Sequence, residues 1–150
     1  MIVRKMRMDD LPQVAAIEAE CSPNPWSQRA FHSELIASTV SQPLVVDWKR
    51  EVIGFIVPWY VADELQIANL AVKPAYRNRG VARMLLLQAL KTAKEKSCQK
   101  AILEVRESNT AARSLYQALG FVEDGVRRHY YRSGNEHAIL MSKDISIEGD

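Results

Sequence analysis

The feature that most constrains the fold is a run of three strand-like segments followed by one long amphipathic helix. Apolar, β-branched and aromatic residues dominate segments 44–46, 52–57 and 65–72, a composition typical of strands. Their succession predicts a meander. Segment 80–96 then carries apolar residues at helical spacing. A chain with this centre is expected to fold around a sheet.

The flanking segments predict the remaining elements. Residues 2–7 alternate as a strand, Asp9 and Asp10 offer a cap to a helix from Leu11, and Ser27 offers a cap to a second helix. The later elements are a strand over 101–105, a helix from Asn109 to a C-terminal Gly120, and strands over 121–126 and 137–143. The order predicts an α/β (α+β) fold with helices on both faces of a central mixed, mostly antiparallel sheet.

Composition indicates one domain and excludes several classes of protein. The 150 residues are 47% hydrophobic with a formal net charge of +2, too weak a field to indicate a nucleic-acid partner. We expect a domain over 1–145 and a loose tail over 146–150. Cys21 and Cys98 lack a CxxC partner, which favours free buried thiols in a reducing compartment. Charges at the N-terminus and the lack of a long apolar run predict a cytoplasmic chain without a membrane span.

The segment from Arg77 to Ala82 is the first candidate for chemistry, because it joins a predicted strand to a predicted helix. Backbone N–H groups at such a junction, together with the helix dipole, can hold an anion. The Gly-Lys-Ser/Thr of a triphosphate loop and the spaced glycines of a dinucleotide fingerprint are absent. A pyrophosphate held without metal fits better. The alternative is that Arg77 and Arg79 are solvated turn residues and Gly80 merely opens a helix.

Glu104 and Tyr116 are the second pair of candidates. Glu104 stands in an apolar strand that we expect to be covered on both faces, where burial would raise its pKa toward that of a useful base. Tyr116 lies on the apolar side of the next helix and could donate a proton into a cleft. The alternatives are a half-solvated strand face for Glu104 and an ordinary core position for Tyr116.

Taken together, these segments resemble the GNAT superfamily of N-acetyltransferases. Arg77-x-x-Gly80-x-Ala82 matches the pyrophosphate motif of that superfamily, and segments 103–109 and 115–121 resemble its downstream acetyl-CoA block. The resemblance runs to about Asp144 and is strongest to the RimI-type ribosomal-protein-alanine N-acetyltransferases. Further matching segments are 25–27, 69–72 and 127–131.

The resemblance implies acetyl transfer from acetyl-CoA to the N-terminal α-amine of a protein, in particular the N-terminal alanine of a small-subunit ribosomal protein, without a metal. It implies Glu104 as general base and Tyr116 as general acid toward the departing CoA thiolate. The implied acetyl-CoA contacts are Leu70, Ala71, Val72, Arg77, Asn78, Arg79, Gly80, Val81, Ala82, Arg83, Asn109 and Tyr116. The chemistry agrees, because the attacking amine must be neutral and the oxyanion needs a backbone donor.

The basic and aromatic run from Arg127 to Arg132 allows two interpretations. It could stack on single-stranded RNA, but no companion RNA-binding motif is present, so a closing-strand loop that grips a peptide is favoured. In the resembling family this region and the loop around residue 26 border the acceptor amine. We therefore expect Trp26, Tyr130 and Tyr131 to contact the substrate.

Two other function classes stay open. One is a GNAT acetyltransferase for lysine or a small-molecule amine, and the other is a non-catalytic RNA- or ribosome-associated module. The second has no need of Glu104, Tyr116 and the loop at 77–82, so an enzyme without direct nucleic-acid contacts is favoured. No metal-ligand spacing or role is assigned to His32, His129 and His137, and the sequence does not specify an oligomeric state.

Overall fold

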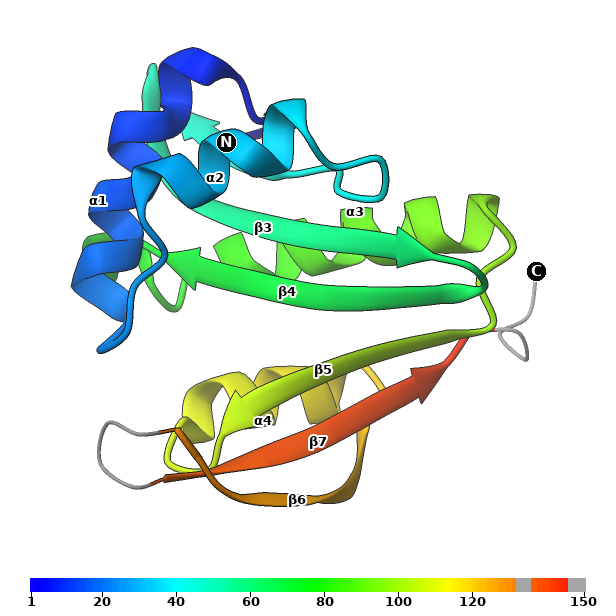
Figure 1. The fold of residues 1–150 in the computed structure, drawn as a ribbon. Helices are drawn as coiled ribbons and strands as arrows, with labels where there is room; N and C mark the ends of the chain where they lie inside the picture. Colours follow the sequence, from blue (N-terminus) through cyan, green and yellow to red (C-terminus); the bar gives the residue numbers. More distant parts are fainter. Residues whose placement is uncertain (132–135, 146–150) are drawn as a thin grey trace.

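The computed structural model of the chain describes residues 1–131, with Tyr131 by its backbone alone, and 136–145. Across these residues the chain forms one seven-stranded sheet in the order β1-β2-β3-β4-β5-β7-β6 (Figure 1). The strands are β1 (Ile2–Lys5), β2 (Leu44–Trp48), β3 (Glu51–Val61), β4 (Glu64–Val72), β5 (Lys100–Arg106), β6 (Val122–Tyr131) and β7 (Glu136–Asp144). Among them β4 and β5 pair in parallel and the other neighbours are antiparallel. The predicted mixed, mostly antiparallel sheet and its meander are confirmed.

Four α-helices pack on the sheet within the described residues, and they are α1 (Leu11–Cys21), α2 (Gln28–Ile36), α3 (Val81–Glu95) and α4 (Thr110–Ala118). The side chains of Ser27 and Asn109 each accept a hydrogen bond from the backbone N–H three residues on, at 3.1 and 3.2 Å. Gly120 follows α4 with a φ of +98°, the left-handed conformation that commonly ends a helix. These predicted caps are confirmed.

The side-chain cap predicted ahead of α1 is wrong. Asp10 adopts helical backbone angles just before Leu11, and its side chain makes no cap to α1. Its carboxylate instead accepts hydrogen bonds from the Arg4 guanidinium at 2.8 and 2.9 Å and from the Arg7 backbone N–H at 2.7 Å. The carboxylate predicted as the cap of α1 is therefore occupied by Arg4 and by the Arg7 backbone.

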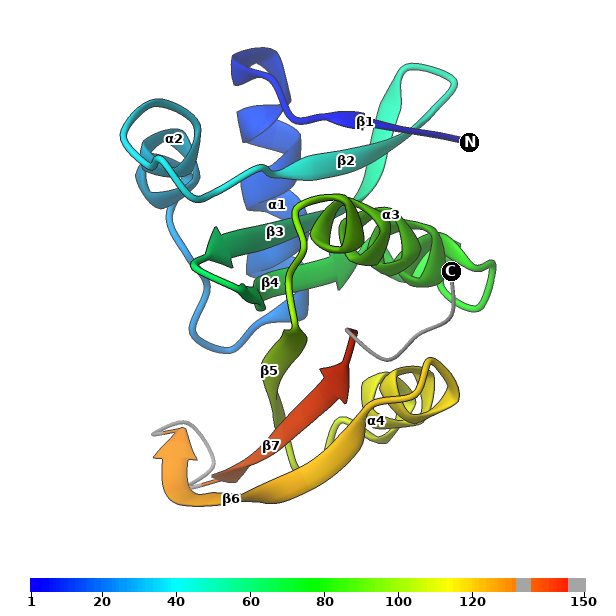
Figure 2. The ribbon, with the colours of Figure 1, turned by 90° about the vertical axis from the view of Figure 1, so that its right-hand side faces the viewer.

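The helices form two layers, one on each face of the sheet. Figure 2 shows α1 and α2 on one side and α3 and α4 on the other. Each layer closes its own apolar core: Phe31 and Phe55 lie in the first, and Leu85, Leu86 and Phe121 in the second. The predicted coverage of both faces is confirmed.

The start of α3 packs directly on β3. A Cβ added to Gly54 would lie 2.9 Å from Cγ1 of Val81 and 3.2 Å from the carbonyl oxygen of Ala71. Only glycine permits so close an approach without a shift of neighbouring atoms. The first turn of α3 is thereby fixed against the central strands.

β4 and β5 part from each other halfway along their length. Their parallel ladder ends where Ile67 pairs with Leu103, and beyond it the strands diverge (Figure 1). At the same level the pairing of β4 with β3 skips Ala68, because Asn69 pairs with Val57 and Ile67 pairs with Pro58. Proline has no N–H to give to a ladder, so a bulge is accommodated there. The later half of β4 therefore has an edge that β5 does not cover.

Two sequence expectations about the C-terminal strands are wrong. On β5, Leu103 and Val105 are buried whereas Glu104 and Arg106 are half-exposed, so that strand is covered on one face. β6 continues through the segment predicted as a loop, as far as Tyr131, with an irregularity at His129, whose φ is +52°. Hydrogen-bonded pairing with β7 keeps this part of β6 in the sheet. Arg132 and the predicted tail over 146–150 lie outside the described residues.

Candidate active site

A cleft of about 600 Å³ opens where β4 and β5 part. The bulge residue Ala68 reaches it from β4, and Glu104 reaches it from β5. We call it the central cleft, and its lining residues are Trp26, Trp59, Gln66, Ile67, Ala68, Ile102, Leu103, Glu104, Asp124, Arg127, Tyr130, Leu140 and Met141. The structure thus brings together Trp26, Glu104 and Tyr130, which the sequence predicts from three distant segments.

Glu104 lies on the open face of β5, and 30% of its side chain is exposed. The expectation that both faces of β5 are covered is therefore wrong, because α3 and α4 lie on the face opposite to Glu104. Oε1 of Glu104 lies 2.8 Å from Nη2 of Arg127, a residue of β6 whose side chain is 51% exposed. The Arg127 guanidinium also lies over the ring of Tyr130, 4.7 Å from its centroid. The candidate base therefore shares the central cleft with a cation.

Tyr116 occupies the other face of the sheet. It is only 6% exposed, belongs to the core beneath α3, and packs on Phe121 with ring centroids 5.8 Å apart. The described lining of the central cleft does not include it. Glu104 and Tyr116 are therefore separated by β5, and a group acted on by both would have to lie between the diverging strands.

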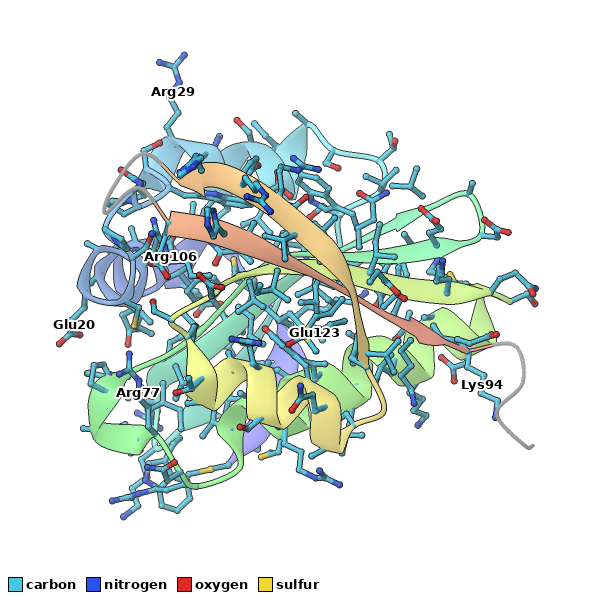
Figure 3. All side chains as sticks on the ribbon, turned by 90° about the horizontal axis from the view of Figure 1, so that it is seen from below. Glu20, Arg29, Arg77, Lys94, Arg106 and Glu123 are labelled. Carbon is cyan, nitrogen blue, oxygen red and sulfur yellow. The ribbon has the colours of Figure 1, made fainter. Side chains whose placement is uncertain are left out.

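The loop ahead of α3 has the backbone of an anion-binding turn. Asn78 and Gly80 both adopt left-handed conformations, with φ of +62° and +81°, and Gly80 sits at the N-terminus of α3. Successive N–H groups at such a turn converge with the helix dipole. The side chains of Arg77, Arg79 and Arg83 are exposed around it, and Figure 3 labels Arg77. Val81 anchors the turn by its burial beside Gly54.

The uncovered half of β4 directs two backbone N–H groups away from β3. Lys73 donates its N–H to the carbonyl of Ile53 at 2.8 Å, and backbone direction alternates along a strand. Leu70 and Val72 therefore face the gap toward β5, whereas Ala71 turns its backbone to β3. The Leu70 N–H donates to Oδ1 of Asn69 at 2.9 Å. Of the three residues predicted to hold the acetyl-pantetheine arm, Leu70 and Val72 thus turn their backbone N–H groups to the gap, and Ala71 does not.

The remaining predicted contacts lie on both sides of the sheet. Trp26 packs on Phe31, with centroids 5.3 Å apart, and lines the central cleft with Tyr130. Asn109 is exposed at the start of α4, with Oδ1 engaged in the helix cap. The side chain of Tyr131 lies outside the described residues.

Sequence reasoning gave no role to several residues of the cleft. Trp59 projects from β3, and its Nε1 donates to Oε1 of Glu34 on α2 at 2.6 Å. Its signal was a tryptophan among the apolar residues that follow the predicted strand over 52–57. Arg127 stood in a recognised motif, but its pairing with Glu104 spans two strands that sequence spacing does not relate. Asp124 gave no signal.

The cysteines and histidines form no metal site in the part of the chain that the structure describes. No group of three His, Cys, Asp or Glu side chains there could hold a metal ion. Both cysteines are free, and Cys98 is buried, which raises the pKa of its thiol. Cys21 is half-buried and accepts a hydrogen bond from Arg77 at 3.3 Å. Over the same residues, no helix is both long and apolar enough to cross a membrane.

Comparison with known proteins identifies relatives along nearly the whole chain. Residues 11–121 match the profile of the acetyltransferase (GNAT) family. The chain is 36% identical over 140 residues to the ribosomal protein bS18-alanine N-acetyltransferase of Salmonella typhimurium, covering 92% of this chain and 93% of the relative. It is 34% identical over 147 residues to the Escherichia coli protein of the same name, covering 97% and 98%.

A solved structure shares the fold as well. The crystal structure of the ribosomal-protein-S18-alanine N-acetyltransferase from Escherichia coli superposes with a TM-score of 0.88 at 32% identity, covering 99% of this chain and 96% of that one. This chain therefore has the same overall fold as that enzyme over nearly its whole length.

Proposed function

This chain belongs to the GNAT family of acetyltransferases and is an acetyl-CoA-dependent N-acetyltransferase, and we propose that its acceptor is the N-terminal α-amine of a protein. The specific acceptor that we propose is the N-terminal alanine of ribosomal protein bS18. The observation that carries this proposal is identity of 34% to 36% over nearly full length to enzymes that bear this activity in their names. Because the proposed acceptor is a ribosomal protein, we propose a cytoplasmic location as well.

Acid–base chemistry favours an α-amine over a lysine. An α-amine has a pKa of about 7.7–8.0, whereas lysine has one of about 10.4, so far more of the α-amine is neutral at physiological pH. Only the neutral amine can attack a carbonyl carbon. An open cleft in which Glu104 is the proposed base suits an acceptor that needs little help in losing its proton.

The residues on the α3 side of the sheet suit acetyl-CoA, which would supply an activated acetyl thioester when bound. Asn78 and Gly80 give the turn ahead of α3 the left-handed geometry that directs N–H groups at a pyrophosphate. Exposed guanidinium groups from Arg77, Arg79 and Arg83 surround it and match phosphate charge. The Val72 N–H would serve the pantetheine arm, and no metal is needed.

Transfer requires one bond to form and one to break. The neutral amine nitrogen forms a C–N bond to the acetyl carbon, the C–S bond breaks, and its electron pair leaves on the CoA sulfur. We assign Glu104 to take the amine proton, directly or through water, and Tyr116 to protonate the departing thiolate. The Leu70 N–H faces the gap where the carbonyl oxygen would carry negative charge, and it would have to release Oδ1 of Asn69 to stabilise that charge. An entering ammonium group would replace Arg127 as the partner of Glu104.

The aromatic walls of the central cleft suit a peptide end. Trp26 and Trp59 lie on the α2 side of the cleft and Tyr130 lies on β6. These flat surfaces can pack on a peptide backbone and on its first side chains. A small amine would leave them unused.

A competition among acceptors tests the proposal. The wild-type enzyme is given acetyl-CoA with an alanine-initiated peptide that contains one internal lysine, the same peptide with a blocked N-terminus, and a polyamine. Mass spectrometry is expected to locate the acetyl group on the α-amine of the first peptide only. Equal acetylation of the blocked peptide supports a lysine acceptor, and acetylation of the polyamine alone supports a small-amine enzyme. Either result overturns the proposal.

A further inference from the structure

Glu18 is a buried acidic residue that the proposed chemistry does not use. It lies on α1 with only 3% of its surface exposed, among core residues such as Val14 and Ile17. A charged side chain is buried at a free-energy cost unless it is hydrogen-bonded. The hydrogen-bond partners of the Glu18 carboxylate therefore indicate its role.

Oε2 of Glu18 accepts two hydrogen bonds from separate parts of the chain. One comes from the backbone N–H of Trp26 at 3.0 Å and the other from Nδ2 of Asn69 at 3.0 Å. Trp26 belongs to the segment between α1 and α2, whereas Asn69 follows the bulge in β4. A single oxygen atom thus joins a loop to the central sheet.

Both partners lead to functional surfaces. The Trp26 side chain lines the central cleft. Oδ1 of Asn69 accepts the Leu70 N–H at 2.9 Å, which faces the gap between β4 and β5. Glu18 itself contributes no lining atom to the described cleft, so any effect that it has on acceptor binding acts through its two hydrogen-bond partners.

We infer that Glu18 is a positioning residue for acceptor recognition: its carboxylate fixes the Trp26 wall of the central cleft at a set distance from β4. The inference rests on the proposed function, because it assumes that the acceptor occupies this cleft. A hydrogen bond constrains distance to within a few tenths of an ångström, so reach, rather than charge, is the property of Glu18 that matters.

A matched pair of substitutions separates reach from charge. Glu18→Asp keeps the charge but withdraws the carboxylate by the length of one C–C bond, roughly 1.5 Å. Glu18→Gln removes the charge but keeps an oxygen acceptor at the same reach. The control Glu20→Asp changes an exposed glutamate on the same helix, whose side chain points away from the molecule (Figure 3).

Steady-state kinetics with both substrates provides the readout. Glu18→Asp is expected to raise the KM for the alanine peptide about tenfold, as expected for the loss of one charge-assisted hydrogen bond, and to leave the KM for acetyl-CoA within about threefold. Glu18→Gln and Glu20→Asp are expected to keep both KM values near those of the wild type. Asn69→Ala removes the hydrogen bond that ties Glu18 to β4, so it is expected to raise the peptide KM several-fold as well.

Three results overturn the inference. The first is a peptide KM for Glu18→Asp equal to that of the wild type, the second is a Glu18→Gln variant as impaired as Glu18→Asp, and the third is a parallel rise of both KM values. If Glu18→Asp does not fold, Asn69→Ala decides the matter, because a peptide KM equal to that of the wild type would show that the tie between Glu18 and β4 does not position the Trp26 wall. A wild-type enzyme that acetylates no peptide refutes the proposed function instead, so the two failures are distinguishable.

Discussion

Nη2 of Arg127 lies 2.8 Å from Oε1 of Glu104, so a cation from β6 holds the carboxylate that faces the central cleft from β5. Both side chains are partly exposed, and an exposed ion pair of this kind contributes about 1 kcal/mol or less to stability. An ammonium group that enters the cleft can therefore replace Arg127 at small cost. The pair marks the place where an acceptor amine would meet Glu104.

From this geometry we expect Glu104→Gln to lower kcat by about 10²–10⁴-fold, the usual contribution of a general base. The amide keeps the shape of the side chain but cannot take a proton. The affinity for CoA is expected to stay unchanged, because the loop ahead of α3 lies on the other side of the sheet. Stopped-time assays with saturating peptide measure kcat, and calorimetry measures CoA binding.

The control for this variant is Glu95→Gln, an exposed carboxylate at the end of α3, which is expected to keep wild-type turnover. Full turnover by Glu104→Gln, under conditions where the chemical step limits the rate, would show that positioning of the reactants alone carries catalysis.

Tyr116→Phe is expected to lower kcat with little loss of stability. The ring that packs on Phe121 is retained, so the core stays filled, whereas the proton donor is lost. The matched control is Tyr60→Phe. Tyr60 donates its hydroxyl to the Ala89 carbonyl at 3.2 Å, and burial raises its pKa to about 12. This control should lower Tm and leave kcat unchanged. If Tyr116→Phe keeps its kcat and Tyr60→Phe loses it, Tyr116 is not the general acid.

Sequence predicted the fold well where its signals are local. The caps at Ser27 and Asn109 and the stop at Gly120 each depend on residues within one helical turn. The meander followed from β-branched composition. The Asp10 cap failed because Arg4 competes for the same carboxylate across a strand–helix junction, and propensity does not encode such competition.

Sequence motifs predicted which residues belong to the candidate site, but not how these residues are arranged in space. The exposure of Glu104 depends on which face of β5 the helices cover, and its pairing with Arg127 depends on the order of β5, β7 and β6 in the sheet. Glu18 did have a local signal. It lies seven residues after Leu11 and four after Val14, on the apolar face of α1, where a charged residue needs an explanation.

Gly80→Ala tests the loop ahead of α3. No described atom lies within 4 Å of a Cβ at this position, but the φ of +81° is unfavourable for alanine, by about 1–2 kcal/mol. We expect Tm to fall by about 2–4 °C per kcal/mol in a chain of this size and the Kd for CoA to rise up to about tenfold. Calorimetry in the presence of a chelator is expected to show wild-type CoA binding without metal.

Gly125→Ala is the control for this change, because Gly125 also has open space around its Cβ position but has an ordinary φ. It should keep both Tm and CoA affinity. If the two variants behave alike, the left-handed conformation of residue 80 has no part in holding CoA.

The ion pair between Asp10 and Arg4 predicts a pH-dependent stability. Burial alone would raise the pKa of Asp10, but hydrogen bonds from the Arg4 guanidinium and the Arg7 backbone outweigh it and hold the pKa below the ordinary value of 3.8. A carboxyl group with a depressed pKa in the folded state stabilises that state fully above its ordinary pKa. The contribution is lost as pH falls through the folded pKa.

Asp10→Asn removes this contribution, and we expect it to cost about 2 kcal/mol at pH 7, the range for hydrogen bonds to a charged group. The corresponding fall in Tm is about 4–8 °C. Thermal unfolding from pH 7 down to pH 2 should show the Tm of the wild type converging on that of the variant below about pH 4, because protonated aspartic acid and asparagine then bind Arg4 equally poorly. Asp9→Asn, which changes the exposed neighbour, should follow the wild-type curve throughout. A constant difference between wild type and Asp10→Asn at every pH would mean that packing, and not charge, is what Asp10 contributes.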